Sequence, residues 1–276
     1  NVSFDTREVQ NLSLFVAIKG TNTDGHNFIN KAEESGACAI VCQELPKILK
    51  DEITYIKVSD SAESLGIIAS NFYDNPSDKL KLVGITGTNG KTTCATLLYD
   101  LYRLMGYKSG LISTVNIKIS HKTYPSTHTT PNAVRLNELL SEMVDQGCTH
   151  VFMEVSSHAL DQKRVAGISF DIAAFTNISR DHMDYHPTID HYIGCKKMLF
   201  NSLKKDAFAI INKDDPYGIE MGREIRAKPI YYGLSEGADF LGKDHSSPNL
   251  SFIIFAISKI DKDLLYKIFR PLALSR

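Results

Sequence analysis

The stretch Val83-Gly-Ile-Thr-Gly-Thr-Asn-Gly-Lys-Thr-Thr93 joins a short apolar run, a glycine-rich turn and the start of a helical pattern. Glycines let backbone N–H groups approach phosphate oxygens closely, and the N-terminus of a helix adds partial positive charge. A lysine at the end of such a turn neutralises the outer phosphates, and the hydroxyl after it can hold Mg²⁺. The stretch therefore predicts a phosphate-binding loop between a strand and a helix.

The loop departs from the strict G-x-x-x-x-G-K-[ST] pattern, because Ile85 stands where that pattern has its first glycine. Gly87, Gly90, Lys91 and Thr92 give the shorter form G-x-x-G-K-T, which also occurs by chance in surface loops. The strand before the loop and the helix after it favour the functional interpretation. The apolar residues that recur at helical spacing are Leu97, Leu98, Leu101, Leu104 and Met105, and Gly106 is the expected stop.

The bulk composition predicts a soluble protein of about two domains. The chain has 276 residues and a net charge of −1, so nothing favours nucleic acid as a partner. Its five cysteines contain no C-x-x-C pair, which fits a reducing cytoplasm. No basic-then-apolar leader is visible, and the late apolar stretch at residues 250–257 is too short to span a bilayer, so we expect no membrane partner.

The chain predicts an α/β fold in two parts. Residues 1–78 form a small α/β domain, which ends in the turn cluster Asp74-Asn-Pro-Ser-Asp78. In residues 79–239 strands and helices alternate, which implies a mainly parallel sheet covered by helices. We expect one continuous extended segment at residues 110–119. Ligands bind at the carboxyl ends of the strands in such sheets. The polar residues at these ends are Thr86, Glu154, Ser156, Asn177, Asn212, Asp214 and Asp215.

Two charged residues, Glu154 and Lys196, stand in largely apolar surroundings. Glu154 ends an apolar run, and a carboxylate there is costly unless it is paired or bound to Mg²⁺; the alternative is an edge-strand side chain in water. Lys196 and Lys197 could form a solvated helix face. Adjacent helical residues point about 100° apart, however, and the neighbours of Lys196 are largely apolar. We therefore expect Lys196 to be partly desolvated with a lowered pKa.

His182, His186 and His191 lie close enough in sequence to suggest zinc. Pro187 interrupts them, however, and no second Cys/His pair has ligand spacing. Mg²⁺ prefers oxygen ligands to imidazole. From spacing alone, these histidines are expected to be hydrogen-bonding loop residues.

Several of these motifs, taken in order, resemble the Mur ligase family, and within it the enzymes that form the UDP-N-acetylmuramoyl-tripeptide. The matching runs are G-T-N-G-K-T-T at residues 87–93, M-E-V-S-S-H at 153–158, T-N-I-S-R-D-H-M-D-Y-H at 176–186 and N-K-D-D at 212–215. At the front, Asp5-Thr6-Arg7, Leu14-Phe-Val-Ala17 and Asp24-Gly25-His26 resemble the uridine-nucleotide domain of the family. The resemblance covers residues 4–239. It implies an N-terminal UDP-MurNAc-binding domain and a central P-loop domain.

The resemblance also implies roles for single residues. Lys91 would touch the β- and γ-phosphates of ATP, and Thr92 and Glu154 would hold one Mg²⁺. Lys196 would react with CO₂, and its carbamate would help His182 to hold a second Mg²⁺. The residues implied to bind ATP are Gly87, Thr88, Asn89, Gly90, Lys91, Thr92, Thr93 and, on the adenine side, Asn212.

Two further groups match positions that bind the other substrate, UDP-MurNAc-L-Ala-D-Glu. The UDP-sugar group is Phe4, Thr6, Thr21, Asn22 and Thr23. The muramoyl-dipeptide group is His128, Thr129, Thr130, Ser156, Gln162 and Arg164. Position 128 carries His where a relative carries Asn.

The activity implied is ATP-dependent amide formation through an acyl phosphate, adding the third amino acid of the peptidoglycan precursor. We favour meso-diaminopimelate over L-lysine and expect a cytoplasmic monomer. In the family a C-terminal, Rossmann-like domain binds the amino acid, and we expect this chain to lack it. Residues 240–276 show no family motif, and we expect a poorly packed tail that arises from a frame change or a truncated gene. The alternatives are a nucleotide- and UDP-sugar-binding fragment without turnover, and a folylpolyglutamate synthase-like ligase.

Overall fold

The computed structural model describes residues 1–21 and 23–241. The chain forms two compact units, and each is described by itself. The first contains residues 1–76, 131–141 and 161–168. The second contains residues 77–130, 142–160 and the described residues from 169 onward. The domain boundaries expected from the sequence stay a prediction. Of the tail expected at residues 240–276, Phe240 and Leu241 form strand β13, and residues 242–276 lie outside the described residues.

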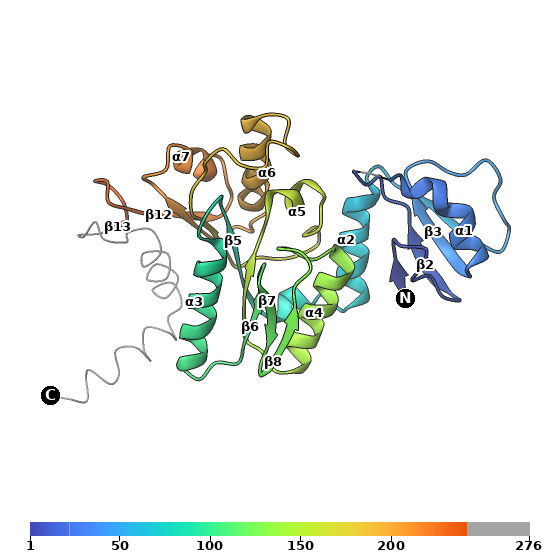
Figure 1. The fold of residues 1–276 in the computed structure, drawn as a ribbon, viewed down its shortest axis with the longest axis horizontal. Coiled ribbons are helices and arrows are strands. Elements are labelled where there is room, and N and C mark those ends of the chain that lie inside the picture. Colours follow the sequence, from blue (N-terminus) through green and yellow to red (C-terminus); the bar gives the residue numbers. More distant parts are fainter. Residues whose placement is uncertain (22, 242–276) are drawn as a thin grey trace. The chain divides into compact units, whose positions relative to one another are not determined.

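The first unit is built on a parallel sheet with the strand order β1-β2-β3-β4. Figure 1 shows β2 and β3 with α1 in the blue, N-terminal part of the ribbon. Its strands are β1 (Val2–Ser3), β2 (Ser13–Val16), β3 (Ala37–Cys42) and β4 (Thr54–Lys57). Its helical segments between residues 1 and 76 are η1 (Gly25–Phe28), α1 (Ile29–Glu34) and α2 (Ser61–Phe72).

Alternation along β3 explains how both faces of this sheet are buried. Ile40 packs in one cluster with Ile29 and Ala32 of α1. Its neighbour Val41 packs in a separate cluster with Leu65 of α2. Helices α1 and α2 therefore cover opposite faces of this sheet, as an α/β domain requires.

The second unit contains a nine-stranded sheet in its described residues, with the order β13-β12-β11-β10-β5-β9-β6-β7-β8. The strands are β5 (Lys81–Thr86), β6 (Ser109–Ile112), β7 (Asn116–Ile119), β8 (Lys122–Pro125), β9 (His150–Glu154), β10 (Ile172–Phe175), β11 (Phe208–Asn212), β12 (Lys228–Gly233) and β13 (Phe240–Leu241). The remaining helical segments of the described residues are η2 (Pro76–Lys79), α3 (Lys91–Leu104), α4 (Ala133–Asp145), α5 (Ser157–Asp161), α6 (Ile189–Asn201) and α7 (Gly218–Gly222).

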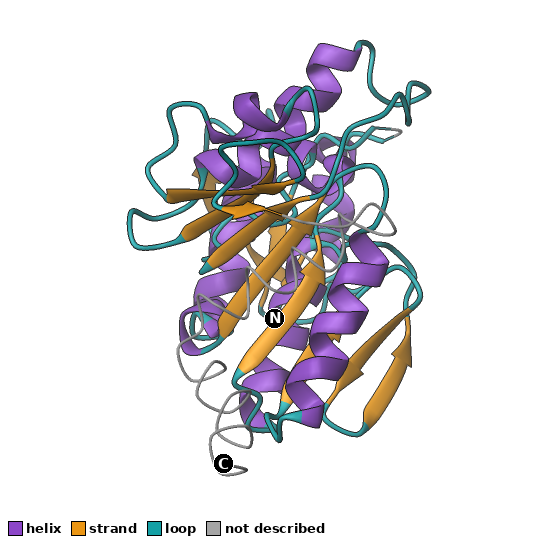
Figure 2. Cartoon of the chain, turned by 90° about the vertical axis from the view of Figure 1, so that its left-hand side faces the viewer, coloured by secondary structure: helices purple, strands orange, loops and turns teal. Residues whose placement is uncertain are grey.

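Neighbouring strands from β13 to β6 run parallel, which confirms the mainly parallel sheet. Figure 2 shows orange strands accompanied by purple helices, as this architecture requires. Alternate residues of β10 show which helix covers which face. Ala174 packs in the cluster that contains Leu98 of α3, whereas Phe175 meets Phe200 of α6 with ring centroids 6.5 Å apart. Because successive side chains of a strand point to opposite faces, α3 and α6 cover opposite faces of the sheet.

The expectation of a single extended segment at residues 110–119 is wrong. The chain turns there, and β6 and β7 pair antiparallel, as do β7 and β8. Ser113 closes the turn, because its Oγ donates to the carbonyl of Asn116 at 2.8 Å and accepts from the N–H of Asn116 at 3.2 Å. A serine that bonds neighbouring backbone groups in this way offers the chain an alternative to an extended strand.

The α3 helix is confirmed, but its buried face is not the leucine stripe that the sequence suggested. Leu98 is buried with Tyr99 and Tyr102, whereas Leu104 is 87% exposed. Tyrosine rings bury a large apolar area, so they compete with leucine for the core. The helix ends as expected: Gly106 has φ +85°, and the N–H of Tyr107 bonds to the carbonyl of Tyr102.

No helix among the described residues has the length and apolar character needed to cross a bilayer. All five cysteines lie within the described residues, and none is in a disulfide.

Candidate functional site

The glycine-rich turn lies at the carboxyl end of β5, in the middle of the sheet, and leads directly into α3. Gly87 has φ +147° and Gly90 has φ +87°, which is a backbone region that favours glycine. A Cβ atom on Gly87 would lie 1.8 Å from Oγ1 of Thr176, so the turn has no room for a side chain there. Both glycines are therefore required by the path of the loop.

The segment after β10 holds this turn in place. The carbonyl of Asn177 accepts a hydrogen bond from the N–H of Thr88 at 2.8 Å, and its Oδ1 accepts from the N–H of Asn89 at 3.0 Å. Oγ1 of Thr176 donates to the carbonyl of Asn89 at 2.7 Å. The side chain of Thr88 in turn lies 2.9 Å from the hydroxyl of Tyr192 on α6. The turn is thus fixed by two neighbouring elements before any ligand binds.

The first turn of α3 supplies the N–H groups of the site. Gly90 is the N-cap of this helix, and no side chain caps it. The first N–H groups of an α-helix have no partner within the helix, and the aligned peptide dipoles place partial positive charge there. Lys91, Thr92 and Thr93 therefore present backbone donors at the end of the loop, which is the arrangement that binds phosphate.

Two lysines converge on one carbonyl of the loop. Nζ of Lys91 and Nζ of Lys196 each donate to the carbonyl of Gly87 at 2.9 Å. Burial lowers the pKa of Lys91, and the carboxylates of Glu154 and Asp181 oppose that change. Burial also lowers the pKa of Lys196 to about 7, with a further contribution from the charge of Lys91. This pair makes the loop electropositive and confirms the expected desolvation of Lys196.

Lys196 and Lys197 have different surroundings, as their helical spacing predicted. Lys196 is 1% exposed, and its Nζ lies 4.4 Å from the ring centroid of Tyr192. Nζ of Lys197 instead donates to the carbonyls of Glu220 and Met221 at 2.7 and 3.1 Å. Only Lys196 reaches the loop.

Glu154 ends β9, directly beside the end of β5, and its side chain is fully buried. The alternative of a solvent-facing edge glutamate is therefore wrong. Oε1 accepts from the N–H of Thr114 at 2.7 Å, and Oε2 accepts from Oγ1 of Thr114 at 3.2 Å. The turn between β6 and β7 thus holds a buried carboxylate close enough to Lys91 to influence its pKa.

His182 and Asn212 stand near the loop in different ways. His182 has φ +56°, is exposed, and lies with its ring centroid 6.3 Å from that of Tyr192, the ring that Lys196 faces. Asn212 is buried, and its Nδ2 donates to the carbonyl of Thr176 at 2.8 Å. Its Oδ1 accepts from the N–H of Asp214 at 3.0 Å. Asn212 therefore supports the ends of the strands with both of its polar atoms.

Three of the expected dipeptide-binding residues of the second unit are linked to Glu154. Oγ1 of Thr130 donates to the carbonyl of Glu154 at 2.8 Å and accepts from the N–H of Ser156 at 3.1 Å. Thr129 accepts from Oγ1 of Thr114 at 3.1 Å, the hydroxyl that also bonds Glu154. His128 is exposed, and its Nδ1 lies 3.1 Å from Oγ1 of Thr127. The structure thus brings Thr129, Thr130 and Ser156 to the same edge as the loop.

The first unit contains a pocket of about 460 Å³ lined by Phe4, Thr6, Thr21 and Thr23. Phe15, Phe28 and Lys31 also line it, so aromatic surface and a cation occur together. Asp5 and Arg7 line it as an ion pair, which lowers the pKa of Asp5. Asn22 lies outside the described residues. The remaining two expected residues, Gln162 and Arg164, bond each other through Oε1 and Nε at 3.0 Å.

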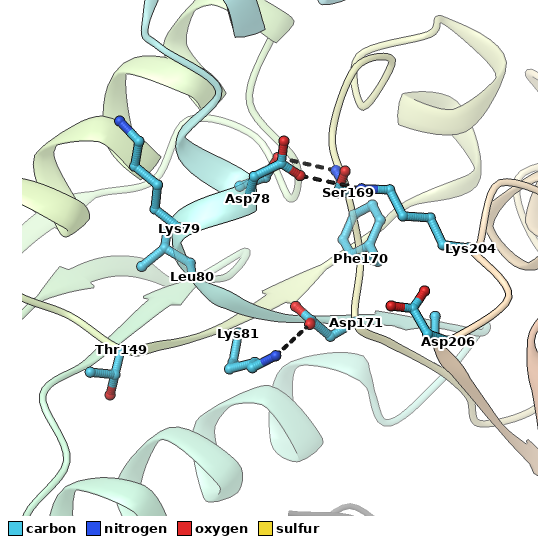
Figure 3. A pocket seen from close by; sticks show the side chains of 12 residues that line it. Asp78, Lys79, Leu80, Lys81, Thr149, Ser169, Phe170, Asp171, Lys204 and Asp206 are labelled. Carbon is cyan, nitrogen blue, oxygen red and sulfur yellow. Dashed lines mark hydrogen bonds and ion pairs between the residues drawn. The ribbon is translucent and has the colours of Figure 1, made fainter.

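A second pocket, of about 310 Å³, lies in the second unit at the opposite, amino-terminal ends of the strands. Two ion pairs occupy it, as Figure 3 shows: Lys81 with Asp171 at 3.1 Å and Lys204 with Asp78 at 3.4 Å. The amino ends of parallel strands are not where such sheets bind ligands. The candidate site is therefore the edge that carries the loop.

Comparison with known families decides the wider assignment. Residues 85–267 match the Mur ligase middle domain, and residues 1–73 match the catalytic domain of the Mur ligase family. The chain belongs to the Mur ligase family. The resemblance inferred from the sequence motifs is thereby confirmed, together with the α/β fold of its N-terminal and middle domains.

Three Mur ligases similar to this chain share one name. A UDP-N-acetylmuramoyl-L-alanyl-D-glutamate--2,6-diaminopimelate ligase of Cytophaga hutchinsonii is 55% identical over 243 residues, which are 88% of this chain and 50% of the relative. The ligase of that name from Phocaeicola vulgatus is 50% identical over 242 residues, again 88% and 50%. A solved structure of a ligase with this name matches with a TM-score of 0.76 and 29% identity, over 88% of this chain and 50% of that one. The chain spans about half the length of these Mur ligases.

Three residues of the site were not expected from the sequence. Thr114 holds the Glu154 carboxylate, and Tyr192 contacts both the loop, through its hydroxyl, and the buried lysine, through its ring. Asn177 was noted only as a strand-end polar residue, yet it bonds two N–H groups of the loop. The one available signal for Tyr192 was its helical spacing of four residues from Lys196, whereas Thr114 lies in a turn that the sequence analysis did not predict.

Proposed function

We propose that this Mur ligase chain binds ATP at the loop after β5 and UDP-MurNAc-L-Ala-D-Glu through its first unit. The reaction that these sites serve is the addition of 2,6-diaminopimelate to that nucleotide. The observation that carries the proposal is the 55% and 50% identity to two ligases of that name. The chain spans about half of their length. We therefore propose the two binding sites for residues 1–241 and the whole reaction for a complete ligase.

ATP would bind with its phosphates over the first turn of α3. The N–H groups of Lys91, Thr92 and Thr93 would donate to phosphate oxygens, together with those of Gly87 and Gly90. The residues Thr88 and Asn89 would shape the loop rather than donate, because Asn177 already occupies their N–H groups. Nζ of Lys91 would exchange its two carbonyl partners for the β- and γ-phosphates, which would also offset the pKa-lowering effect of its burial.

The oxygen donors at this edge suit Mg²⁺. Hard cations prefer carboxylate and hydroxyl ligands, and Glu154 and Thr92 offer one of each. Glu154 is buried beside the loop and influences the pKa of Lys91, so its carboxylate is close enough to serve a phosphate-bound ion. When bound, Mg²⁺ would neutralise phosphate charge during phosphoryl transfer.

Lys196 would contribute as a carbamate. With a pKa of about 7, an appreciable fraction of its amine is neutral near pH 7, and only the neutral amine attacks CO₂. The nitrogen forms a bond to carbon and loses a proton to solvent, which leaves an anionic carbamate. The carbamate oxygens would stand in place of a buried cation and, together with His182, would hold a second Mg²⁺ ion.

The chemistry on this edge would be positioning and charge stabilisation. The γ-carboxylate of D-Glu attacks the γ-phosphorus of ATP, which releases ADP and forms an acyl phosphate. Lys91 would balance the charge on the transferred phosphoryl group. The amine of the incoming amino acid then attacks the acyl carbon and releases phosphate. Thr129, Thr130 and Ser156 stand beside Glu154, so they would orient the reacting carboxylate.

The first-unit pocket suits a uridine nucleotide. Phe4 and Phe28 offer rings against which a base can stack, and Thr6, Thr21 and Thr23 offer hydroxyls. Lys31 supplies a cation for a diphosphate. A folylpolyglutamate synthase-like activity would not require this unit, and the match of residues 1–73 to the Mur ligase family favours the UDP-sugar.

The names of the relatives favour 2,6-diaminopimelate over L-lysine as the amino acid. We further propose that the protein acts in the cytoplasm, because its proposed substrates are soluble, and that it is a monomer, as expected from the sequence.

Binding of the two nucleotides to the purified chain tests the proposal. Calorimetric titration should detect one site for a non-hydrolysable Mg²⁺–ATP analogue and one for UDP-MurNAc-L-Ala-D-Glu. Lys91→Ala should weaken the first and spare the second, and Lys205→Ala, a change at an exposed lysine, should spare both. Absence of binding by either nucleotide would contradict the proposal. Release of ADP that requires both the dipeptide nucleotide and diaminopimelate would show turnover by the chain. Binding of both nucleotides without ADP release would favour a binding fragment.

A further inference from the structure

Three metal-ligand side chains meet at the start of α6, and the proposed ligase reaction uses none of them. Nδ1 of His186 lies 2.9 Å from Nδ1 of His191. Sγ of Cys195 lies 3.9 Å from the first nitrogen and 3.7 Å from the second. The three candidate ligand atoms all lie within 4.8 Å of one another.

These separations approach those of three ligands around one tetrahedral ion. Zinc binds imidazole nitrogen at about 2.0–2.1 Å and thiolate sulfur at about 2.3 Å. Tetrahedral angles then place two nitrogens about 3.4 Å apart and a nitrogen and the sulfur about 3.6 Å apart. The observed N–S separations are within about 0.3 Å of this value, and the N–N separation needs to open by about 0.5 Å. Small rotations of partly exposed His191 can supply that change.

Local structure explains why these residues meet. His191 and Cys195 are four residues apart on α6, so they share one face of the helix. The helix begins at a fixed point, because Oγ1 of Thr188 accepts from the N–H of His191 at 3.1 Å. His186 approaches from the preceding segment, where its N–H bonds to the carbonyl of His182 at 2.9 Å. Sequence spacing alone does not pair the histidines with Cys195, because Pro187 and the change from loop to helix separate them along the chain.

A further contact orients His186 as a ligand. Nε2 of His186 lies 2.9 Å from Oγ of Ser157, and both residues are buried. Metal-bound histidines usually donate their other ring N–H to a fixed acceptor, which sets the tautomer. If Nε2 carries the hydrogen toward Ser157, the lone pair of Nδ1 points at the cluster. Ser157 therefore stands where a metal site needs its supporting residue.

The donor set selects a class of metal. Two imidazole nitrogens and one thiolate suit Zn²⁺, whereas Mg²⁺ prefers oxygen ligands. The cluster is thus chemically separate from Glu154 and Thr92, which offer oxygen. His186 and Cys195 are buried and His191 is partly exposed, so an ion could enter past His191 and keep one water as its fourth ligand.

We propose that His186, His191 and Cys195 bind a single Zn²⁺ ion. The ion ties the segment before α6 to the helix, one residue before Lys196. Binding replaces the thiol proton of Cys195, which is released to solvent. The site does not depend on ATP or the UDP-sugar, so it stands or falls separately from the proposed ligase function.

Titration of the metal-free chain with Co²⁺ under anaerobic conditions tests the site. Tetrahedral Co²⁺ bound to a thiolate gives intense visible bands and a near-ultraviolet charge-transfer band. We expect these bands to saturate at one equivalent and to vanish when Zn²⁺ is added. Cys195→Ser should abolish the charge-transfer band, and the matched change Cys148→Ser, at another buried cysteine, should leave it intact.

Two further variants keep the test decisive if Cys195→Ser fails to fold, which far-ultraviolet circular dichroism would reveal. His191→Gln changes a partly exposed ligand and should abolish tight binding. Ser157→Ala should weaken binding by roughly 10- to 100-fold while leaving the ligands in place. Absence of the bands in the wild-type chain, or their persistence in folded Cys195→Ser or His191→Gln, would overturn the proposal and leave only a hydrogen-bonded histidine pair.

Discussion

Replacing Lys196 by methionine tests how strongly burial acts on the amine at the centre of the site. Methionine has a similar length and no charge, so the change removes the cost of burying a cation with little change in packing. Lys196 is 1% exposed, and its pKa is lowered from 10.5 to about 7. The variant is therefore expected to be more stable than the wild type at neutral and acidic pH.

The sign and size of the effect follow from the two pKa values. Below pH 7 the amine of Lys196 is protonated in both the folded and the unfolded chain. The folded chain then bears the full free-energy cost of burying the cation, about 5 kcal/mol. Between pH 7 and 10.5 the folded chain releases a proton that the unfolded chain keeps, so wild-type stability rises by up to about 1.4 kcal/mol per pH unit. The loss of the hydrogen bond to Gly87 offsets about 1 kcal/mol of the gain in the variant.

Urea unfolding of both proteins at pH 6 and pH 9, in buffers freed of CO₂, measures the effect. The stabilisation by Lys196→Met should be about 3 kcal/mol larger at pH 6 than at pH 9. Lys205→Met, at an exposed lysine, should show no such difference and serves as the control. An equal effect of Lys196→Met at both pH values, or destabilisation at pH 6, would refute the argument that the buried amine has a strongly lowered pKa.

Three other changes bear on the same loop. Lys91→Ala should weaken binding of an ATP analogue by roughly 10- to 100-fold in a calorimetric titration, because a charge-assisted contact is lost; unchanged affinity would argue against the loop as the phosphate site. Gly87→Ala should lower the free energy of unfolding by at least about 1 kcal/mol and impair nucleotide binding, since its Cβ would clash with Oγ1 of Thr176; wild-type urea unfolding would show that the loop adapts. Lys196→Ala should inactivate a complete ligase, and a small carboxylate such as acetate should restore part of the ADP release; full activity without acetate would eliminate the carbamate.

Local patterns predicted the framework of the site well. The strand before Gly87 and the helix after Lys91 could both be predicted, because the spacing of apolar residues changes at the loop from that of a strand to that of a helix. Desolvation of Lys196 could also be predicted, since its neighbours on one helix are fixed by spacing alone. These features depend on residues close together in sequence.

Contacts between distant segments could not be predicted in the same way. Thr114 meets Glu154 because the chain turns after β6, and the sequence suggested a continuous extended segment there. Tyr99 and Tyr102, not Leu104, face the core from α3, because sheet packing and not hydropathy alone selects the buried face. Asn177 supports the loop only because β10 pairs with β5, and strand order does not follow from periodicity.

A crystal structure of the chain with Mg²⁺ and a non-hydrolysable ATP analogue tests the central claim most directly. The account predicts the β- and γ-phosphates over the N–H groups of Lys91, Thr92 and Thr93, with Nζ of Lys91 moved from the carbonyls of Gly87 and Thr88 to the phosphates. An analogue bound elsewhere at a concentration that saturates the chain in solution, with Lys91 still on those carbonyls, would contradict it.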